Sequence, residues 1–365
     1  MEISESESQI NESTPDGVKK RMRGLIDWFK LKTGQMPSQT NKTKNKEKRH
    51  EKNNVCSHIY DFKFEHSNRR VAILIINSFK ISEQPERPFA DEDKTKMKKL
   101  FELLDFEVIV LENRKSGDLW EDLQAINREI ENNCDCLACV ISSHGAEIPI
   151  ASSSETSPQP RHHVLYTEDN IIPTDTILQL FNDENCPNLQ GKPRIFFIQA
   201  CRSIFDIAPK SEVDEGYTID LVQDQVDIDK VPEKTKETLA DTHGRHEEEE
   251  NNLSNCKPIE PVDFCLIPCY EDYLVMFSSS SGKLGWSDKG KGGWLMYCLF
   301  TVFEELLDTN FENFLQILSR VCGKMATDLE TSHRNKMYNE TKSAAVIYHM
   351  LTKDLYLRPK SMMEK

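Results

Sequence analysis

The hydrophobic positions of this chain fall into short runs that predict buried strands separated by helices. Four nearly continuous apolar runs are typical of strands covered on both faces, at 71–79, 106–112, 136–145 and 194–201. Apolar residues at helical spacing predict helices between them, at 91–104, 117–132 and 174–181. We expect the helix over 174–181 to be capped by Thr174 or Asp175.

A second block of apolar pattern follows a long polar interval. It predicts a strand and loop over 273–286, helices over 292–308 and 311–329, and a last strand over 343–352. Strand alternating with helix predicts an α/β fold, a doubly wound sheet of about six mostly parallel strands with helices on both faces. The chain then divides into a leader (1–58), a first block (59–202), an acidic linker (203–265), a second block (266–358) and a tail (359–365).

Charge is unevenly distributed along the 365 residues, whose formal net charge is −15. Residues 19–52 carry a net charge of +9, whereas residues 203–265 carry a net charge of −11. Both segments are poor in apolar periodicity, so we expect solvated chain outside the core there. The overall negative charge argues against nucleic acid as the main partner.

One stretch of the leader has a helical pattern. In VKKRMRGLIDWF, residues 18–29, apolar residues fall at helical spacing and most basic residues lie elsewhere. Such a basic amphipathic helix can lie on a membrane surface or dock on a partner, although more often it does neither. A leader of 58 residues is too short for a six-helix recruitment bundle at about 11 residues per helix.

The eleven cysteines are odd in number and show no framework spacing. The polar residues MEISESESQI at the start of the chain do not resemble a secretory signal. No apolar run approaches the roughly 18–20 residues that cross a bilayer. These features favour free thiols in a reduced, cytoplasmic compartment.

A cysteine and a histidine stand at the ends of two predicted strands. Cys201 lies in QACRS, and His144 lies 57 residues upstream in SSHG. Parallel strands end at one edge of a sheet, where open α/β folds place their sites. Cysteine chemistry needs a thiolate, a proton carrier and oxyanion donors, which Cys201, His144 and the amides of Gly145 and Cys201 would supply. The alternative is that Cys201 is a small hydrophobe where a strand ends.

The sequence QACR with an upstream histidine is close to a caspase signature, and residues 59–357 resemble the caspases. Three further segments occur in caspase order: NCPNLQGKPRIFFIQACR, LIPCYEDYLVMFS and MLTKDLYL. Caspases are cysteine endopeptidases that cleave after aspartate. The resemblance therefore implies that Cys201 is the nucleophile, that His144 is the acid and base, and that the Gly145 and Cys201 amides bind the oxyanion.

The resemblance also implies a pocket for the substrate aspartate. QPERPFADEDKTKM resembles the family segment whose arginine binds that side chain, which maps onto Arg87, and Gln199 maps onto the pocket glutamine. A buried carboxylate favours a bidentate guanidinium and a neutral donor. Trp286 and Trp294 resemble the aromatic walls for substrate side chains further from the cut. The alternative for both rings is packing in the core or at its rim.

Two residues depart from the family pattern. The usual Ser-Trp-Arg loop reads Gly285-Trp286-Ser287, so Ser287 keeps the backbone that pairs with an extended peptide and loses a cation. Ser203 stands where glycine is usual, and a positive φ there would cost of order 1–2 kcal/mol and displace the Cys201 amide. We expect an active enzyme that is weak or unusual in specificity.

Two motifs invite interpretation as a zinc site: CDCLAC at 134–139 and the histidine pair at 162–163. Alternate residues of a strand point to opposite faces, so the three thiols cannot all converge on one ion. We therefore expect CDCLAC to be strand core, and we predict neither a metal nor a cofactor.

Caspases are made as single-chain precursors and matured by cuts at aspartates. The resemblance thus makes 59–202 the large-subunit part and 266–358 the small-subunit part of one catalytic domain. Candidate cuts in the acidic linker are Asp214, Asp220, Asp227 and Asp241, and a cut at Asp16 would release the leader. Exposed, extended chain is where proteases cut best. DQVD, which ends at Asp227, best fits an acid three residues before the cut, although Ile228 is a poor residue to follow.

Three interpretations compete. The leading one is the zymogen of a cysteine endopeptidase that cleaves proteins after aspartate in programmed cell death, as a homodimer or as a heterodimer with a related caspase. The second is a catalytically impaired caspase-like regulator that modulates an active relative, which Ser287 and Ser203 favour and the intact dyad opposes. The third, a flavodoxin-like binding module, fits the strand pattern but lacks a glycine-rich phosphate loop after 71–79.

Overall fold

The computed structural model describes residues 58–60, 62, 68–82, 84–149, 161–203, 265–306, 312–332 and 338–359. The helix that we predict at 18–29 lies outside these residues, as does nearly all of the acidic linker. In the part of the chain that is described, no helix is long and apolar enough to cross a membrane.

Six strands form the central sheet in the order β12-β9-β7-β3-β1-β2. They are β1 (Arg69–Ile76), β2 (Glu107–Glu112), β3 (Cys134–Ser142), β7 (Arg194–Gln199), β9 (Tyr273–Phe277) and β12 (Val346–His349). All neighbours run parallel except β12, which is antiparallel to β9. The predicted six-stranded, mostly parallel sheet is therefore confirmed.

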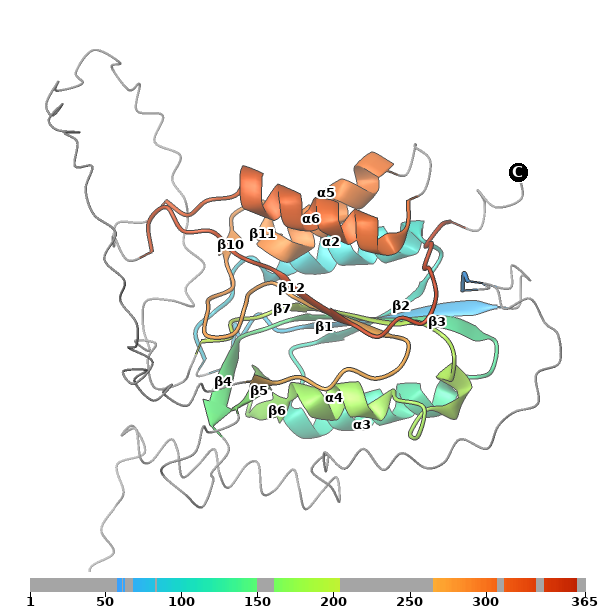
Figure 1. The fold of residues 1–365 in the computed structure, drawn as a ribbon. Helices are drawn as coiled ribbons and strands as arrows, with labels where there is room; N and C mark the ends of the chain where they lie inside the picture. Colours follow the sequence, from blue (N-terminus) through green and yellow to red (C-terminus); the bar gives the residue numbers. More distant parts are fainter. Residues whose placement is uncertain are drawn as a thin grey trace, which may run out of the picture.

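Helices cover both faces of this sheet (Figure 1). One face carries α2 (Ala90–Leu103), α5 (Trp294–Leu306) and α6 (Phe314–Asp328), and the other carries α3 (Ser116–Glu129) and α4 (Thr174–Leu180). In β1, Ala72 and Leu74 pack in the core under α2, α5 and α6, which we call the first core. Ile73 and Ile75 pack in the second core, under α3 and α4. Burial on both faces explains why the strand is a continuous apolar run in the sequence.

A set of short strands was not predicted from the sequence pattern. Antiparallel β4 (Gly145–Pro149), β5 (Arg161–Tyr166) and β6 (Ile171–Pro173) form a small sheet that β8 (Cys265–Leu266) joins through β5. A hairpin pairs β10 (Ser287–Asp288) with β11 (Gly292–Gly293), and a 3₁₀ turn spans Pro187–Leu189. Segments of two to six residues are too short for a hydrophobic period to be recognised.

The start of α4 differs from the prediction. Its N-cap residue is Pro173 and makes no side-chain capping bond, so neither Thr174 nor Asp175 caps the helix. Thr174 Oγ1 instead lies 2.7 Å from Nδ1 of His163. The Asp175 carboxylate lies 2.7 Å from Nδ1 of His162. The cap prediction is wrong because two histidines of β5, which the local sequence does not reveal as partners, bind the candidate capping side chains.

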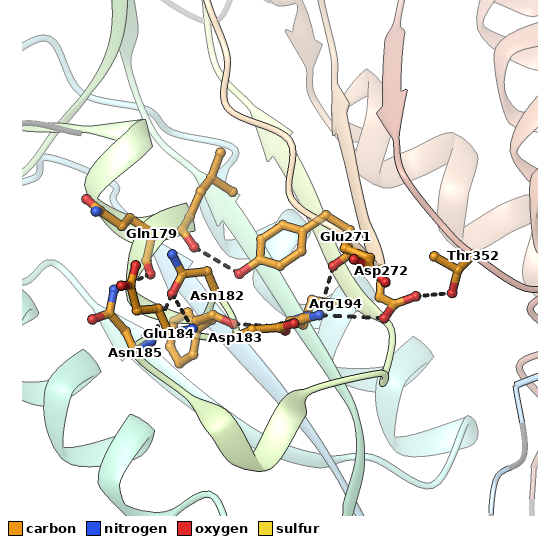
Figure 2. Close-up of polar contacts among 12 residues, drawn as sticks. Gln179, Asn182, Asp183, Glu184, Asn185, Arg194, Glu271, Asp272 and Thr352 are labelled. Atoms are coloured by element: carbon orange, nitrogen blue, oxygen red, sulfur yellow. Dashed lines mark hydrogen bonds and ion pairs between the residues drawn. The ribbon is translucent and has the colours of Figure 1, made fainter. Parts of the chain in front are cut away.

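A buried polar network joins the amino ends of β7 and β9 (Figure 2). Arg194 in β7 is fully buried, with its guanidinium 2.6 Å from the Asp183 carboxylate and 2.8 Å from the Glu271 carbonyl oxygen. Asp272 accepts hydrogen bonds from Tyr60, at 2.6 Å, and from Thr352. The network connects the two blocks of the chain at the end of the sheet opposite to the predicted site.

The cysteines of CDCLAC lie in the cores, as the sequence predicts. Cys136 packs in the first core, whereas Cys134 and Cys139 pack in the second. Burial raises the pKa of Cys134 to about 11 and that of Cys139 to about 12. Among the described residues, no group of three or more His, Cys, Asp or Glu side chains is placed to hold a metal ion.

Candidate active site

Strands β3 and β7 bring His144 and Cys201 to the same edge of the sheet. The two strands are parallel neighbours with Ser142 opposite Gln199, and each predicted residue follows its strand by two positions. Both side chains are buried, with His144 3% and Cys201 4% exposed. His144 and Cys201 lie at the same edge because the two parallel strands that precede them end there.

His144 is held by groups from three segments of the chain. Its Nε2 lies 2.7 Å from the carbonyl oxygen of Pro85. A carbonyl can only accept, so Nε2 carries a proton and Nδ1 is the atom that can exchange one. The ring stacks on Phe79 with centroids 4.8 Å apart and meets the Tyr166 ring at 6.3 Å. Phe79 has a φ of +57°, a strained backbone conformation for a bulky residue. Strained conformations of this kind are enriched at functional sites.

The thiol of Cys201 contacts the loop that follows β9. The N–H of Gly285 donates to Sγ at 3.2 Å, and Sγ lies 3.7 Å from the Gly285 carbonyl oxygen. A Cβ at Gly285 would lie 3.0 Å from Ser278 Oγ and 3.1 Å from the Ala200 carbonyl oxygen. The loop therefore closes over the nucleophile at van der Waals distance, and glycine permits this approach.

The backbone beside Cys201 is fixed by hydrogen bonds. The carbonyl of Ala200 accepts from the hydroxyls of Ser278 and Ser279, each at 3.3 Å. Because a trans peptide is planar, the N–H of Cys201 points away from that carbonyl, in a direction that Ser278 and Ser279 set. At Gly145 a Cβ would lie 2.7 Å from the Cys201 carbonyl oxygen. Only glycine therefore fits against the nucleophile here.

Arg87 is held beside the end of β3 by groups that accept hydrogen bonds from its guanidinium. Its Nη1 donates to the Asn77 carbonyl oxygen and its Nη2 to Ser142 Oγ, both at 2.8 Å. Ser142 Oγ in turn donates to the carboxylate of Asp93 at 2.5 Å. The guanidinium also lies 3.7 Å from this carboxylate and is 12% exposed. The orientation of the Arg87 guanidinium is therefore fixed by these contacts, and part of the side chain remains exposed to solvent.

Asp93 is a site residue that the sequence analysis missed. It is completely buried in α2, and burial raises the pKa of its carboxyl while Arg87 opposes part of the rise. The N–H of Gly293 donates to its other oxygen at 2.6 Å. A signal was available, because Asp93 falls among the buried positions of α2 with Ala90 and Met97. An acid on the apolar face of a helix requires partners.

Gln199 is held by both ends of its side-chain amide. Nε2 donates to the Trp286 carbonyl oxygen at 3.1 Å, and Oε1 accepts from the Leu295 N–H at 3.2 Å. A Cβ at Gly293 would overlap the Gln199 side chain. Since the N–H of Gly293 also binds Asp93, the surroundings of Gln199 and of Arg87 meet at Gly293.

Ser287 and Trp286 lie beside this meeting point. Ser287 pairs with Gly293 in the β10–β11 hairpin. Trp286 is partly buried, and its ring lies 6.4 Å from that of Trp294 and 6.3 Å from that of Tyr338. Trp294 is 2% exposed and packs in the first core. The structure therefore places Trp294 behind Trp286 and leaves Trp286 the more accessible ring.

Ser203 is not among the described residues that have a positive φ. Its carbonyl oxygen accepts from the N–H of Glu147 at 2.9 Å, alongside β4. The strain considered for a serine at this position therefore does not arise. The five candidate processing sites lie outside the described residues: Asp16, Asp214, Asp220, Asp227 and Asp241.

The chain is similar to known proteins over most of its length. Residues 69–356 match the family described as the caspase domain. Caspase-7 of Gallus gallus is 28% identical over 267 residues, which are 73% of this chain and 69% of the relative. Caspase-3 of Xenopus laevis is 26% identical, covering 84% of this chain and 86% of the relative. The crystal structure of Caspase-1 from Spodoptera frugiperda has the same fold, with a TM-score of 0.57 and 23% identity over 84% of this chain and 95% of that one. With the family match spanning most of its length, the chain belongs to the caspase family.

Proposed function

We propose that this protein is a cysteine endopeptidase that cleaves proteins after aspartate. The observation that carries the proposal is the convergence of a thiol, an imidazole and a guanidinium at one edge of the sheet. The thiol and imidazole follow adjacent strands, and the guanidinium is held by Ser142 at the end of β3. A nucleophile, a base and a carboxylate-binding group are what cleavage after aspartate requires.

In the proposed mechanism, Sγ of Cys201 attacks the carbonyl carbon of the residue before the cut. Nδ1 of His144 takes the thiol proton and later donates it to the leaving amine, while the Pro85 carbonyl holds the ring through Nε2. The N–H groups of Gly145 and Cys201 stabilise the oxyanion. Water then hydrolyses the thioester with His144 as the base.

Substrate recognition follows from the groups around Gly293. Arg87 and Gln199 would bind the aspartate carboxylate, and Asp93 with Ser142 orients the guanidinium. Trp286 would line the path of the residues before the aspartate. The backbone at Ser287 would pair with the extended peptide, as an added strand does.

The cellular context is also part of the proposal. We infer a cytoplasmic zymogen that is cut in the acidic linker and acts in programmed cell death. Dimerisation through β12 is supported by its place at the end of the sheet and by its sequence, VIYH, which has no acid, Lys or Arg. The opposite edge strand, β2, carries Glu107 and Glu112. Uncharged edges accept further strands more readily than charged ones.

A second candidate function is a catalytically impaired regulator that pairs with an active caspase. It is favoured by Ser287, which puts a neutral side chain at the hairpin position where the caspase pattern has an arginine. The contact between Gly285 and Sγ of Cys201 also favours it, because the loop covers the nucleophile. The enzyme is favoured by Arg87 and by the position of His144 and Cys201 after neighbouring strands.

The two functions can be separated by measuring turnover of a tetrapeptide library. The full-length protein is assayed before and after linker cleavage. The enzyme should release product only from peptides with aspartate before the cut, and Cys201→Ala should release none. An aspartyl chloromethylketone should label Cys201 and no other cysteine. Turnover that survives Cys201→Ala, or a cleaved protein that turns over no peptide, would contradict the proposed enzyme.

A further inference from the structure

His163 lies directly behind the nucleophile, although its sequence motif suggested no role there. It is completely buried in β5 and faces Glu147 in the β4–β5 pairing. Its Nε2 lies 3.1 Å from the carbonyl oxygen of Cys201 and its Nδ1 lies 2.7 Å from Thr174 Oγ1. The ring also meets the edge of Phe277 with centroids 5.1 Å apart.

The partners of His163 determine which nitrogen carries its proton. The Cys201 carbonyl can only accept, so Nε2 must be the N–H donor. Nδ1 then has the lone pair, and the hydroxyl of Thr174 donates to it. Burial, together with the nearby charge of Arg202, lowers the pKa of His163 to about 3. The imidazole is therefore neutral, with one defined tautomer, over the pH range in which cysteine peptidases work.

The hydrogen bond from His163 acts on the peptide that follows the nucleophile. The N–H of Arg202, at the other end of that peptide, donates to the Lys283 carbonyl oxygen at 2.8 Å. A Cβ at Gly145 would lie 2.9 Å from Nε2 of His163 and 2.7 Å from the Cys201 carbonyl oxygen. His163, Gly145 and Cys201 are thus in mutual contact, and a displaced His163 would shift both predicted oxyanion donors.

We propose that His163 is a positioning residue for the cleavage reaction, which holds the Cys201 carbonyl so that the Cys201 and Gly145 amides keep the geometry of the oxyanion hole. The inference rests on the proposed function. The neighbouring His162 has no such role, because its ring binds the Asp175 carboxylate instead. The role of His163 also gives a reason for Thr174 to bind a ring rather than to cap α4.

The test compares three variants of the full-length, linker-cleaved protein. His163→Leu removes the donor, His163→Gln restores an N–H donor, and His162→Leu is the matched control on the same strand. We expect His163→Leu to lower kcat roughly tenfold to a hundredfold with KM within about threefold of wild type, as for a small displacement of catalytic groups. His163→Gln should recover most of the loss, and His162→Leu should keep wild-type kcat.

A second readout separates positioning of the oxyanion hole from general damage. Alkylation of Cys201 by iodoacetamide forms no oxyanion, so its rate, followed by mass spectrometry of the Cys201 peptide, should stay within about threefold in His163→Leu. Affinity for an aspartyl aldehyde, which forms a tetrahedral adduct, should fall with kcat. Equal losses in alkylation and turnover, or wild-type kcat in His163→Leu, would overturn the inference.

Imidazole NMR of the wild-type protein tests the arrangement without any variant having to fold. The His163 signal, assigned with His163→Gln, should show a proton at Nε2 only and should not titrate between pH 5 and pH 8. A proton at Nδ1, or titration in that range, would overturn the inference. If wild-type protein cleaves no peptide, the proposed function fails while this NMR result still decides the arrangement of His163.

Discussion

Arg87 is oriented by hydrogen bonds from its guanidinium to Ser142 and to the Asn77 carbonyl oxygen. Ser142 lies between its guanidinium and the carboxylate of Asp93, and the N–H of Gly293 satisfies the other oxygen of that carboxylate. Holding Arg87 in this way reduces the conformational entropy that substrate binding would otherwise cost. In the proposed enzyme, the pocket is thus formed before the substrate arrives.

Replacing Arg87 by alanine tests this pocket. Arg87→Ala would leave the substrate carboxylate in a partly buried pocket with neutral donors only, and breaking a buried charge pair costs about 3–5 kcal/mol. We expect kcat/KM for aspartate peptides to fall by at least about a hundredfold. Exposed Arg128 offers the control, since Arg128→Ala should change kcat/KM little. A loss below threefold in Arg87→Ala would show that the pocket lies elsewhere.

At Ser287, where the caspase pattern has an arginine, the experiment adds a cation and is expected to raise kcat/KM. Ser287 pairs with Gly293, next to the groups that hold Arg87 and Gln199. An arginine at this position should add a charge-assisted contact of about 1.5–3 kcal/mol, so Ser287→Arg should raise kcat/KM on aspartate peptides about tenfold or more. Ser287→Gln, which adds a polar but uncharged side chain, should not. If Ser287→Arg only tightens binding of an aspartyl aldehyde without raising kcat, the regulator is favoured.

His163 also makes stability depend on pH. Folding lowers the pKa of this residue from its usual value to about 3, so below about pH 6.5 the unfolded chain binds a proton that the folded chain does not. The free energy of unfolding should therefore fall by about 1.4 kcal/mol per pH unit from this residue as the pH drops from about 6.5 towards 3. Arg202 is the charged group that lowers this pKa along with burial. Urea titrations at pH 7 and pH 5 should show a smaller difference in His163→Gln than in wild type, and an equal difference would contradict the pKa assignment.

At the scale of elements, the site lies where short strands meet the ends of long ones. β4 begins at Gly145 beside the nucleophile, and the β10–β11 hairpin reaches α2 through the bond from Gly293 to Asp93. The long strands are stabilised by burial of apolar residues on both faces. The short ones approach the site closely at Gly145 and Gly293, so one added methyl group there should have a large local effect.

Gly293→Ala is the variant that tests the hairpin. The new Cβ would overlap the side chain of Gln199, so either Gln199 or β11 must move. We expect KM for aspartate peptides to rise about tenfold or more with a smaller change in kcat, because in the proposed mechanism Gln199 binds substrate and does not transfer protons. Gly323→Ala is the matched control, since nothing lies within 4 Å of its Cβ in α6. An unchanged KM in Gly293→Ala would show that Gln199 does not bind the substrate.

At the scale of the whole molecule, the two blocks of the chain form one sheet. β9 from the second block lies between β7 of the first block and β12. The network around Arg194 and Asp272 adds contacts between the blocks at the far end of the strands (Figure 2). Cutting the linker should therefore leave the fragments associated.

Maturation tests this organisation together with the proposed zymogen. Wild-type protein expressed alone should be cut between residues 204 and 264, after one of the aspartates predicted there, and Cys201→Ala should remain intact. The two fragments should co-elute in size-exclusion chromatography, because separating them would expose β7 and β9, whose residues are all buried. Mass spectrometry identifies the cut. A fully active, uncut chain would mean that activation needs dimerisation alone.

The long strands, most helices and the shared sheet edge of His144 and Cys201 could be predicted from the hydrophobic pattern. Runs such as 194–201 are buried on both faces, so their apolar character is visible without knowledge of the partners. Strand ends in a parallel sheet share an edge, and this rule alone brings the two residues together. The family motifs then pointed to Arg87 and Gln199, which lie at the same edge.

The contacts that hold these groups in place join residues far apart in the chain and became visible only in the fold. Asp93 lies near Arg87 in the chain, but its bond from Gly293 spans 200 residues. Thr174 looks like a helix cap and instead binds His163, whose other nitrogen binds the Cys201 carbonyl 38 residues away. Polar side chains have several candidate partners in any local sequence, and burial in the folded chain selects among them. For this reason the sequence pointed to candidate residues for the chemistry, while the contacts that hold them became visible only in the fold.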